Sequence, residues 1–424
     1  MPLGVGVIGA GVVGGGVVEL LLANRTIAHG KTGVDVRLAH VADLNTTALE
    51  AFDMTEVAVS NDARTLINDT SVQIVCELIG GIEPARTFIL EALNAGKPVV
   101  TANKKLLAMH GEELCEAAVT NGVELRYEAS TGGCIPIIKA IRESLAANRI
   151  EQAYGILNGT CNYILTRMTF EGSDFDSVLA DAQANGFAET PPDLDINGDD
   201  TAHKCQVLAS LAFSSKIALD DIHVEGITKI TAQDVAYARE MGYLIKLLAI
   251  MRDDGDTIEA RVHPTLVPEE HLLAAVRYEF NGVFVKSDFA DATLHYGRGA
   301  GRKPTASAVV ADVFDIARRA GAKAEPPFVY DRTRPLRPMG DLSMRYYLRL
   351  TTRDKPGVLG KVCTILGAHG VSIASCIQKE KHDADAAHVI LMSWEANESA
   401  VQAAVQEIDA LPFITEPTHL LRVL

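Results

Sequence analysis

Roughly the first 130 residues alternate between short apolar runs and longer segments in which apolar residues recur at helical spacing. Short apolar runs bounded by glycine or polar residues are typical of buried parallel strands. We expect strands at 3–8, 34–43, 72–79, 97–101 and 123–128, and helices at about 12–22, 84–95 and 104–121. Strands that alternate with helices in this way predict a doubly wound parallel sheet.

The pattern changes after about residue 133, where strands and helices no longer alternate. We expect helices at about 137–147, 160–170, 175–184 and 199–210, a strand at 150–157 and further strands through 258–300. The acidic, proline-containing stretch 186–198 is predicted to be a loop, and Asn281-Gly282 to be a turn. These elements predict an α+β domain with one mixed sheet and helices on one side. A following helix at 303–320 is expected to pack back on the first domain.

A third unit is predicted at the C-terminal end. Residues 321–343 contain four prolines and several arginines, a composition typical of a linker. Beyond them we expect strands at 344–350, 371–379 and 388–393 and helices at 357–369 and 399–411. The order β-α-β-β-α-β is that of a ferredoxin-like unit. The predicted units are therefore 1–133, 134–320 and 344–424, with 321–343 as the linker.

Composition and charge exclude several classes of protein. The 424-residue chain has 39 basic and 55 acidic residues, a formal net charge of −16, and only 5% aromatic residues. Nucleic-acid binding would require a basic surface or stacking aromatics, so no nucleic-acid partner is expected. The 7 cysteines are odd in number and lack CxxC spacing, which favours a reducing compartment over a disulfide framework. With no signal-peptide pattern and no apolar run of about 20 residues, we expect a cytoplasmic protein without a membrane partner.

A glycine motif, Gly9-Ala10-Gly11-Val12-Val13-Gly14, follows the first predicted strand and opens the first predicted helix. In a dinucleotide-binding turn, the first glycine permits the tight turn, the second lets pyrophosphate approach the backbone, and the third allows close packing of helix on sheet. The N–H groups at the helix start, those of Val12 and Val13 included, can bind the anion. This context predicts a Rossmann-like domain that binds NAD or NADP, the alternative being a merely tight connection.

Asp43 ends the second predicted strand, where a carboxylate can accept a hydrogen bond from the adenosine ribose and so favours NAD. An NADP site would place a basic residue nearby, but Ala42 and Asn45 supply none and Arg37 lies further back along the strand. The alternative is an ordinary solvated acid. We expect a preference for NAD, or use of both cofactors.

Two clusters of charged residues are candidates for the chemistry. Lys104 stands between a predicted strand and helix, at the edge of the sheet that faces the ligand crevice, while Lys105 should point elsewhere. Asp200 and Lys204 are four residues apart and share one helix face, after a loop rich in acids. Carboxylates beside a lysine suit a zwitterionic substrate, with an ammonium group to hold and an oxygen to protonate. A solvated acidic loop remains the alternative, whereas a calcium loop is disfavoured because the EF-hand spacing is absent.

Together these residues resemble the homoserine dehydrogenase family over nearly the whole chain. The motifs, in family order, are GAGVVG at 9–14, ELIGG at 77–81, TANKK at 101–105, YEASTGGCIP at 127–136, GILNGTCNYI at 155–164, GFAE at 186–189, DINGDDTAHK at 195–204 and GAGRKPTAS at 299–307. The C-terminal unit, with RDKPGVL at 353–359, resembles an ACT domain, a regulatory module that binds amino acids.

The resemblance implies reversible NAD(P)-dependent interconversion of L-homoserine and L-aspartate 4-semialdehyde, within threonine, methionine and isoleucine biosynthesis. It implies that Lys204 is the acid/base and that Lys104 lies beside cofactor and substrate. The implied substrate-binding acids are Glu189, Asp195 and Asp200. The implied cofactor contacts, with those already named, are Gly186 and Gly301. A sodium ion is implied at Glu128, Thr131, Gly133 and Ile135, mostly through main-chain carbonyls.

One departure from the family pattern concerns the cofactor, because Ala42 precedes Asp43 where many relatives carry an arginine. By the same resemblance we expect an amino-acid effector, with threonine as the first candidate. We also expect the protein to form a homodimer or homotetramer. Since domains joined by a linker often fold separately, deletion from about Asp341 should leave an active enzyme that ignores the effector. Two alternatives stay open: another NAD(P)-dependent amino-acid dehydrogenase, or a non-catalytic sensor of amino acids and nucleotides.

Overall fold

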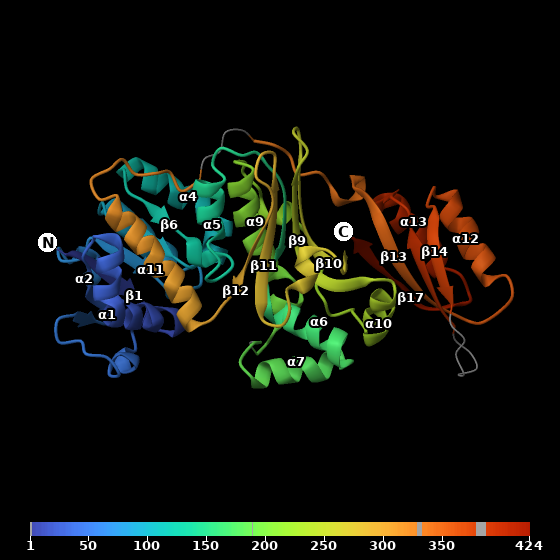
Figure 1. The fold of residues 1–424 in the computed structure, drawn as a ribbon, viewed down its shortest axis with the longest axis horizontal. Helices are drawn as coiled ribbons and strands as arrows, with labels where there is room; N and C mark the ends of the chain where they lie inside the picture. Colours follow the sequence, from blue (N-terminus) through green and yellow to red (C-terminus); the bar gives the residue numbers. More distant parts are fainter. Residues whose placement is uncertain (1, 189, 329–332, 379–386) are drawn as a thin grey trace.

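The chain forms three structural parts in a row (Figure 1). The structure, a computed structural model, describes residues 2–188, 190–328, 333–378 and 387–424. In Figure 1 the N-terminal parallel sheet lies at the left, a mixed sheet in the centre and the C-terminal unit at the right. The fold class predicted from the sequence, with a doubly wound, an α+β and a ferredoxin-like part, is confirmed.

The first sheet has six parallel strands in the order β3-β2-β1-β4-β5-β6. They are β1 (Leu3–Ile8), β2 (Val36–Ala42), β3 (Ala58–Ser60), β4 (Ile74–Glu77), β5 (Val99–Thr101) and β6 (Leu125–Arg126). The helices between them are α1 (Val12–Thr32), α2 (Ala63–Asn68), α3 (Ala85–Asn94) and α4 (Lys104–Asn121). The strand order reverses direction between β1 and β4, and in such sheets ligands bind at the carboxyl ends of the strands at that point.

Helix α1 is longer than the sequence pattern predicted. It continues past residue 22 to Thr32 and ends at Gly33, whose φ of +73° is left-handed. Its second half is largely exposed, so the apolar periodicity that marked the first half is lost there. Helix α11 (Arg302–Arg318) packs along α1, where a Cβ on Gly16 would lie 2.8 Å from the Arg302 carbonyl oxygen.

The central sheet begins with β12-β11-β7-β9-β10 and continues into the C-terminal unit. Its strands are β7 (Ile150–Ile156), β9 (Tyr243–Asp253), β10 (Ile258–Pro268), β11 (Phe280–Ser287) and β12 (Asp291–Arg298), with β8 (His223–Val224) beside β10. The helices of this part are α5 (Ile137–Lys139), extended by a π-helical turn at 140–144, α6 (Gly159–Glu171), α7 (Phe175–Ala184), α8 (Asp193–Ile196), α9 (Asp199–Ala212) and α10 (Ala232–Glu240). The sequence pattern did not predict β9 and α10.

Two predictions for this part are wrong. Asn281-Gly282 lies inside β11 and not in a turn. Asn281 is 1% exposed and donates from Nδ2 to the Leu157 carbonyl at 2.9 Å, while a Cβ on Gly282 would lie 2.7 Å from Val276 Cγ2. The hydrogen bond to Leu157 explains the asparagine at 281, and the close packing against Val276 explains the glycine at 282. The stretch 186–198, predicted to be a loop, also contains the single-turn helix α8 directly after Pro192.

The C-terminal unit has the predicted β-α-β-β-α-β order. It comprises β13 (Ser343–Thr352), α12 (Val358–Ala368), β14 (Ile373–Gln378), β15 (Ala387–Ser393), α13 (Glu398–Asp409) and β17 (Ile414–Val423), with the short β16 (Ala396–Asn397). Its strands lie in the order β17-β13-β15-β14. The end of β17 pairs in parallel with β10, with Thr265 opposite Arg422 and Leu266 opposite Val423. One sheet of eleven strands therefore runs through both parts.

Candidate active site

The glycine loop joins β1 to α1 in the geometry of a pyrophosphate-binding turn. Gly9 has a φ of +93°, and a Cβ on Gly14 would lie 1.7 Å from the Gly9 carbonyl oxygen. A Cβ on Gly11 would meet no atom within 4 Å, so this position opens to a ligand. Helix α1 starts at Val12, which is 68% exposed, with Val13 half-buried beside it. The first N–H groups of α1 thus face an open crevice.

A cavity of about 320 Å³ lies against this loop, lined by residues 11–13, 77–80 and 102–103. Its far wall depends on Glu77, a residue to which the sequence analysis gave no role. Glu77 is fully buried; its Oε1 accepts from Ile79 N at 2.9 Å and its Oε2 from Thr101 Oγ1 at 2.8 Å. The position between β1 and β4 fits a dinucleotide.

Asp43 lies directly beside the glycine loop. Its Oδ2 accepts from Ala10 N at 2.5 Å and its Oδ1 from Asn45 N at 2.8 Å. The carboxylate therefore holds the loop in place, a role that the sequence analysis did not foresee. Each oxygen keeps a further lone pair for a ribose hydroxyl.

Asp200 brings the two candidate lysines together. It lies in the first turn of α9, with Oδ2 2.6 Å from Lys204 Nζ and Oδ1 2.8 Å from Lys104 Nζ. Lys204 Nζ also donates to the Leu157 carbonyl at 2.7 Å. The Lys204 side chain is 9% exposed and that of Lys104 39%, whereas Lys105 is exposed. Helix α4 of the first domain and α9 of the second thus meet at one carboxylate, close to the end of the crevice.

Asn158 completes this cluster, and the sequence analysis assigned it no role. Its Nδ2 donates to Asp195 Oδ1 at 2.7 Å and to Asp200 Oδ2 at 2.9 Å, while its Oδ1 caps α6 by accepting from Cys161 N. Asp195 also accepts from Thr160 Oγ1 at 3.2 Å. An asparagine before a helix signals the cap from sequence, but the contact of its amide with distant acids has no such signal.

Burial sets the protonation of these groups. Burial and the nearby Lys104 charge lower the pKa of Lys204, and the Asp200 carboxylate opposes that shift. Burial tends to raise the pKa of Asp200, but the two ammonium groups outweigh it and hold that pKa below its usual range. Burial raises the pKa of Asp195, and the Asp200 charge adds to it. The site therefore contains a lysine whose pKa is lowered beside a carboxylate whose pKa is lowered as well.

The remaining candidate residues lie around this cluster. Glu189 lies outside the described residues. Gly186 follows α7, next to Phe187, whose carbonyl accepts from Thr160 Oγ1 at 2.6 Å. Gly301 precedes α11, where Arg302 Nη2 donates to the Gly15 carbonyl at 3.1 Å. Gly186 thus lies on the side of Asp195, and Gly301 on the side of the glycine loop.

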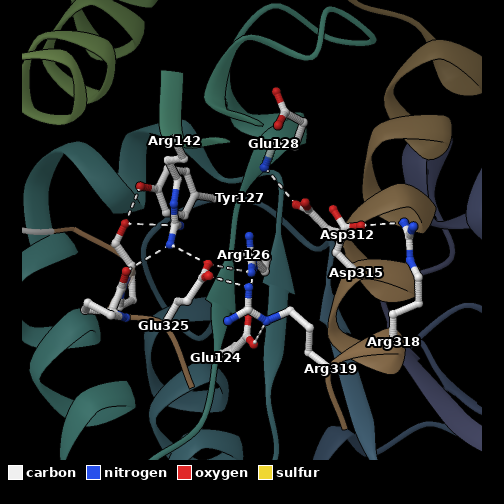
Figure 2. Close-up of polar contacts among 12 residues, drawn as sticks. Glu124, Arg126, Tyr127, Glu128, Arg142, Asp312, Asp315, Arg318, Arg319 and Glu325 are labelled. Carbon is white, nitrogen blue, oxygen red and sulfur yellow. Dashed lines mark hydrogen bonds and ion pairs between the residues drawn. The ribbon is translucent and has the colours of Figure 1, made fainter. Parts of the chain in front are cut away.

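The residues of the candidate sodium site lie between β6 and α5. Both Glu128 carboxylate oxygens accept main-chain hydrogen bonds, Oε1 from Ile138 N at 2.9 Å and Oε2 from Lys139 N at 2.8 Å. Figure 2 shows this carboxylate pointing away from Asp312, to which the Glu128 main-chain N–H donates at 2.8 Å. Burial raises the pKa of Glu128 to about 7. A cation beside the buried carboxylate would offset that cost, so the donor set fits a metal ion.

The loop 131–135, which supplies the other candidate sodium residues, packs against residues 298–299. Gly133 has a φ of +59°, and a Cβ there would lie 2.5 Å from the Gly299 carbonyl oxygen. Cys134 N donates to the Arg298 carbonyl at 3.2 Å. Thr131 is fully buried and Ile135 is 1% exposed. The tight approach of two segments explains the glycine at 133.

Comparisons with known proteins agree with this architecture. Residues 136–314 match the family model described as homoserine dehydrogenase, residues 9–128 that of its NAD-binding domain, and residues 346–413 that of the ACT domain. The homoserine dehydrogenase of Neisseria gonorrhoeae is 40% identical over 100% of this chain and 98% of its own. That of Synechocystis is 40% identical over 100% of both chains. The crystal structure of a homoserine dehydrogenase from Thiobacillus denitrificans has a TM-score of 0.93 and 41% identity, covering 100% of this chain and 98% of that one.

The fold and the site define an oxidoreductase that uses a nicotinamide dinucleotide and carries an ACT domain. More specifically, the chain belongs to the homoserine dehydrogenase family. Its activity is the NAD(P)-dependent interconversion of L-homoserine and L-aspartate 4-semialdehyde. The non-catalytic alternative is therefore set aside. No helix in the described part of the chain combines the length and apolar character needed to cross a membrane.

Proposed function

We propose that Lys204 is the acid/base of the reaction and that Asp200 orients it. The observation that carries this proposal is the contact of Asp200 with both Lys104 and Lys204 at the junction of the two domains. In the reductive direction, Lys204 Nζ gives a proton to the substrate carbonyl oxygen as negative charge grows there. In the oxidative direction it takes the proton back. Its buried position supports this role, because burial brings the lysine closer to its neutral form at working pH.

Lys104 and the other acids would hold the substrate. Lys104 begins α4 and follows the residues that line the crevice, so it can bridge cofactor and substrate oxygen. We assign Asp195, together with Glu189, to the substrate ammonium group. The assignment of Asp195 is supported by its hydrogen bond from the Asn158 amide, which also donates to Asp200. The experiment that tests the assignment is turnover of homoserine by Lys204→Ala, with binding of the reduced cofactor as the control for folding.

The cofactor would occupy the crevice between β1 and β4. Gly9, Gly11, Val12, Val13 and Gly14 would hold its pyrophosphate through the N–H groups of α1, with Gly186 and Gly301 beside it. When bound, the nicotinamide ring supplies or accepts the hydride. We propose that NAD is used at least as well as NADP, because the Asp43 carboxylate, directly after β2 and beside the glycine loop, would repel a 2′-phosphate on the adenosine ribose.

Two further features belong to this proposal. We assign a sodium ion to the Glu128 carboxylate and the carbonyls of Thr131, Gly133 and Ile135, on the ground that a cation would offset the burial of this carboxylate, each of whose oxygens keeps a further lone pair. We also assign feedback control by an amino acid, threonine first, to the ACT domain, and a homodimer or homotetramer as the assembly. Activity measured in sodium and in potassium buffers, with and without threonine, tests the sodium and effector assignments.

A further inference from the structure

The turn between α8 and α9 links two acids of the active site. This turn, residues 196–198, has Asp195 immediately before it and Asp200 two residues after it. Gly198 has a φ of +93° and serves as the N-cap of α9. Any shift of this short turn moves both carboxylates, because neither is more than two residues away from it.

A second segment, residues 225–227, is pressed against the α8–α9 turn. A Cβ on Gly226 would lie 2.1 Å from the Ile196 carbonyl oxygen and 2.5 Å from Asn197 Cα. Ile227 N donates to that same Ile196 carbonyl at 2.8 Å. The two backbones are therefore in direct contact, with no side chain between them to absorb a movement.

The C-terminal unit holds this segment through an ion pair between the buried Arg422 and Glu225, whose side chain is 36% exposed. Arg422 of β17 is 1% exposed and donates from Nη1 to Glu225 Oε2 at 2.8 Å. On its other side, Arg422 binds both oxygens of Glu398, at 2.6 and 3.0 Å, at the start of α13. His223 Nε2 lies 2.8 Å from Glu225 Oε1. Glu225 is thus fixed by two side chains, one from each part of the continuous sheet.

The energetics make this pair sensitive to change. Burial tends to raise the pKa of Glu225, but the bonds from His223 and Arg422 outweigh burial and hold that pKa below its usual range. Arg422 is buried, so losing an acceptor costs it free energy, and a Glu225 released from Arg422 turns toward solvent because its side chain is partly exposed. The segment 225–227 would then shift to find another partner or water, and the α8–α9 turn would shift with it.

We propose that Arg422 and Glu225 are positioning residues of the active site: the C-terminal unit sets the placement of Asp195 and Asp200 through residues 225–227 and the α8–α9 turn. This inference rests on the proposed roles of Asp195, Asp200 and Lys204. Neither Arg422 nor Glu225 touches substrate or cofactor; they act through main-chain contact. The same path gives a ligand bound to the C-terminal unit a direct route to the catalytic carboxylates.

The same interface offers a matched control. Arg349 of β13 donates from Nε to Asp234 Oδ1 at 2.6 Å, and Asp234 is fully buried in α10. Helix α10 contacts the C-terminal end of α6, where Arg239 Nη1 donates to the Thr169 carbonyl at 3.3 Å. This pair joins the same two parts of the protein without contact to the α8–α9 turn.

The test compares Arg422→Lys and Glu225→Gln with Arg349→Lys and Asp234→Asn in the full chain. We expect the first two variants to lose about tenfold or more in kcat/KM for homoserine, with the cofactor KM changed less than about twofold. The two control variants should lower Tm at least as much, because Asp234 is more deeply buried than Glu225, and yet keep kcat/KM. A double variant, Glu225→Gln with Arg422→Lys, should lose less than the product of the two single losses.

The inference is overturned if kcat/KM is retained in folded Arg422→Lys and Glu225→Gln, or if the control variants lose as much. Gly226→Ala gives an independent measurement, because its Cβ would push directly on the α8–α9 turn. It should reproduce the loss in kcat/KM without altering the ion pair, and retained activity in this variant also counts against the inference. Lys204→Ala separates the two proposals: normal turnover there defeats the active-site assignment, whereas an inactive Lys204→Ala beside unaffected Arg422 and Glu225 variants defeats only this one.

Discussion

Lys104 Nζ lies 2.8 Å from Asp200 Oδ1, a contact that joins the first helix turn of α4 to that of α9 across the two domains. Asp200 binds Lys204 at the same time, so one carboxylate stands between two ammonium groups. Two ammonium groups this close to one another repel. In the folded protein the carboxylate relieves that repulsion, and burial becomes the main reason for the lowered pKa of Lys204.

Replacement of the lysines should separate their roles. Lys204→Ala should lower kcat by about 10²–10⁴-fold, the range for loss of one acid/base, with cofactor affinity nearly unchanged. Lys104→Ala should also be severe, because it loses the contact that joins the domains at Asp200. Lys105→Ala is the matched control, since Lys105 is exposed. Steady-state kinetics and titration with reduced cofactor measure both effects. Near-normal turnover in folded Lys204→Ala would refute the assignment.

Asn158→Asp isolates the amide donor of the acid cluster. Aspartate still caps α6, but it cannot donate to Asp195 and Asp200 and adds a third negative charge. We expect kcat/KM to fall by about tenfold or more, because leaving buried acceptors unpaired costs about 1–3 kcal/mol. The added charge should also raise the pKa of Lys204, moving the corresponding limb of the pH–rate profile upward. A profile that superimposes on the wild-type profile would show that Asn158 does not act on the lysine.

The sequence predicts the parts of this site that depend on residues close together in the chain, and it does not predict contacts between distant residues. The glycine loop and the Asp200–Lys204 pair are set by spacings of a few residues, so the sequence predicts them. Asn158 binds Asp195 and Asp200 across 37 and 42 residues, a relationship that only the fold creates. In the same way, β10 and β17 pair through two residues each, Thr265 with Arg422 and Leu266 with Val423, and no pattern of neighbouring residues predicts this pairing. Asn281-Gly282 has the composition of a turn, but Asn281 is buried inside β11, and its contact with the Leu157 carbonyl, 124 residues away, has no local signal.

The cofactor preference should depend on Asp43. In Asp43→Asn the amide oxygen can keep one of the two main-chain bonds, while the charge that opposes a 2′-phosphate is removed. The ratio of kcat/KM for NADP⁺ over NAD⁺ should rise about tenfold or more. Asp43→Ala should raise the ratio as well, but with weaker binding of both cofactors because the loop loses its support. If the wild type strongly prefers NADP⁺ and neither substitution changes the ratio, the carboxylate does not face the ribose.

Stability should depend on pH through Lys246. This residue of β9 is 2% exposed, donates to the Val276 carbonyl and Asn162 Oδ1, and burial lowers its pKa to about 7. In the unfolded chain its pKa is about 10.4, so between these values the unfolded state binds more protons. The contribution of Lys246 to the free energy of unfolding should therefore rise with pH above about 7, by up to about 1.4 kcal/mol per pH unit.

Thermal unfolding of Lys246→Met at several pH values between 6 and 9 measures this contribution. The Tm of the wild type minus that of the variant should increase as the pH rises, because the variant has no titrating group at this position. Lys303→Met is the control, since its side chain is 79% exposed and should give a difference independent of pH. A constant difference between wild type and Lys246→Met would mean that the buried lysine keeps its proton throughout the range.

Removal of the C-terminal unit should destabilise the rest of the chain. The proline-rich stretch alone predicts separable domains, but the structure joins them through the β10–β17 pairing. Deletion from Asp341 onward would expose the edge of β10 and leave the buried Asp234 and the partly exposed Glu225 without their arginine partners. We expect a lower Tm, self-association through the exposed edge and a lower kcat/KM. We also expect the truncated enzyme to lose any inhibition by threonine. Thermal unfolding, size-exclusion chromatography and threonine inhibition of both forms measure this. A truncated enzyme that keeps its Tm, assembly and activity would show instead that the β10–β17 pairing contributes little to stability. The domains would then fold separately, as the linker composition predicts.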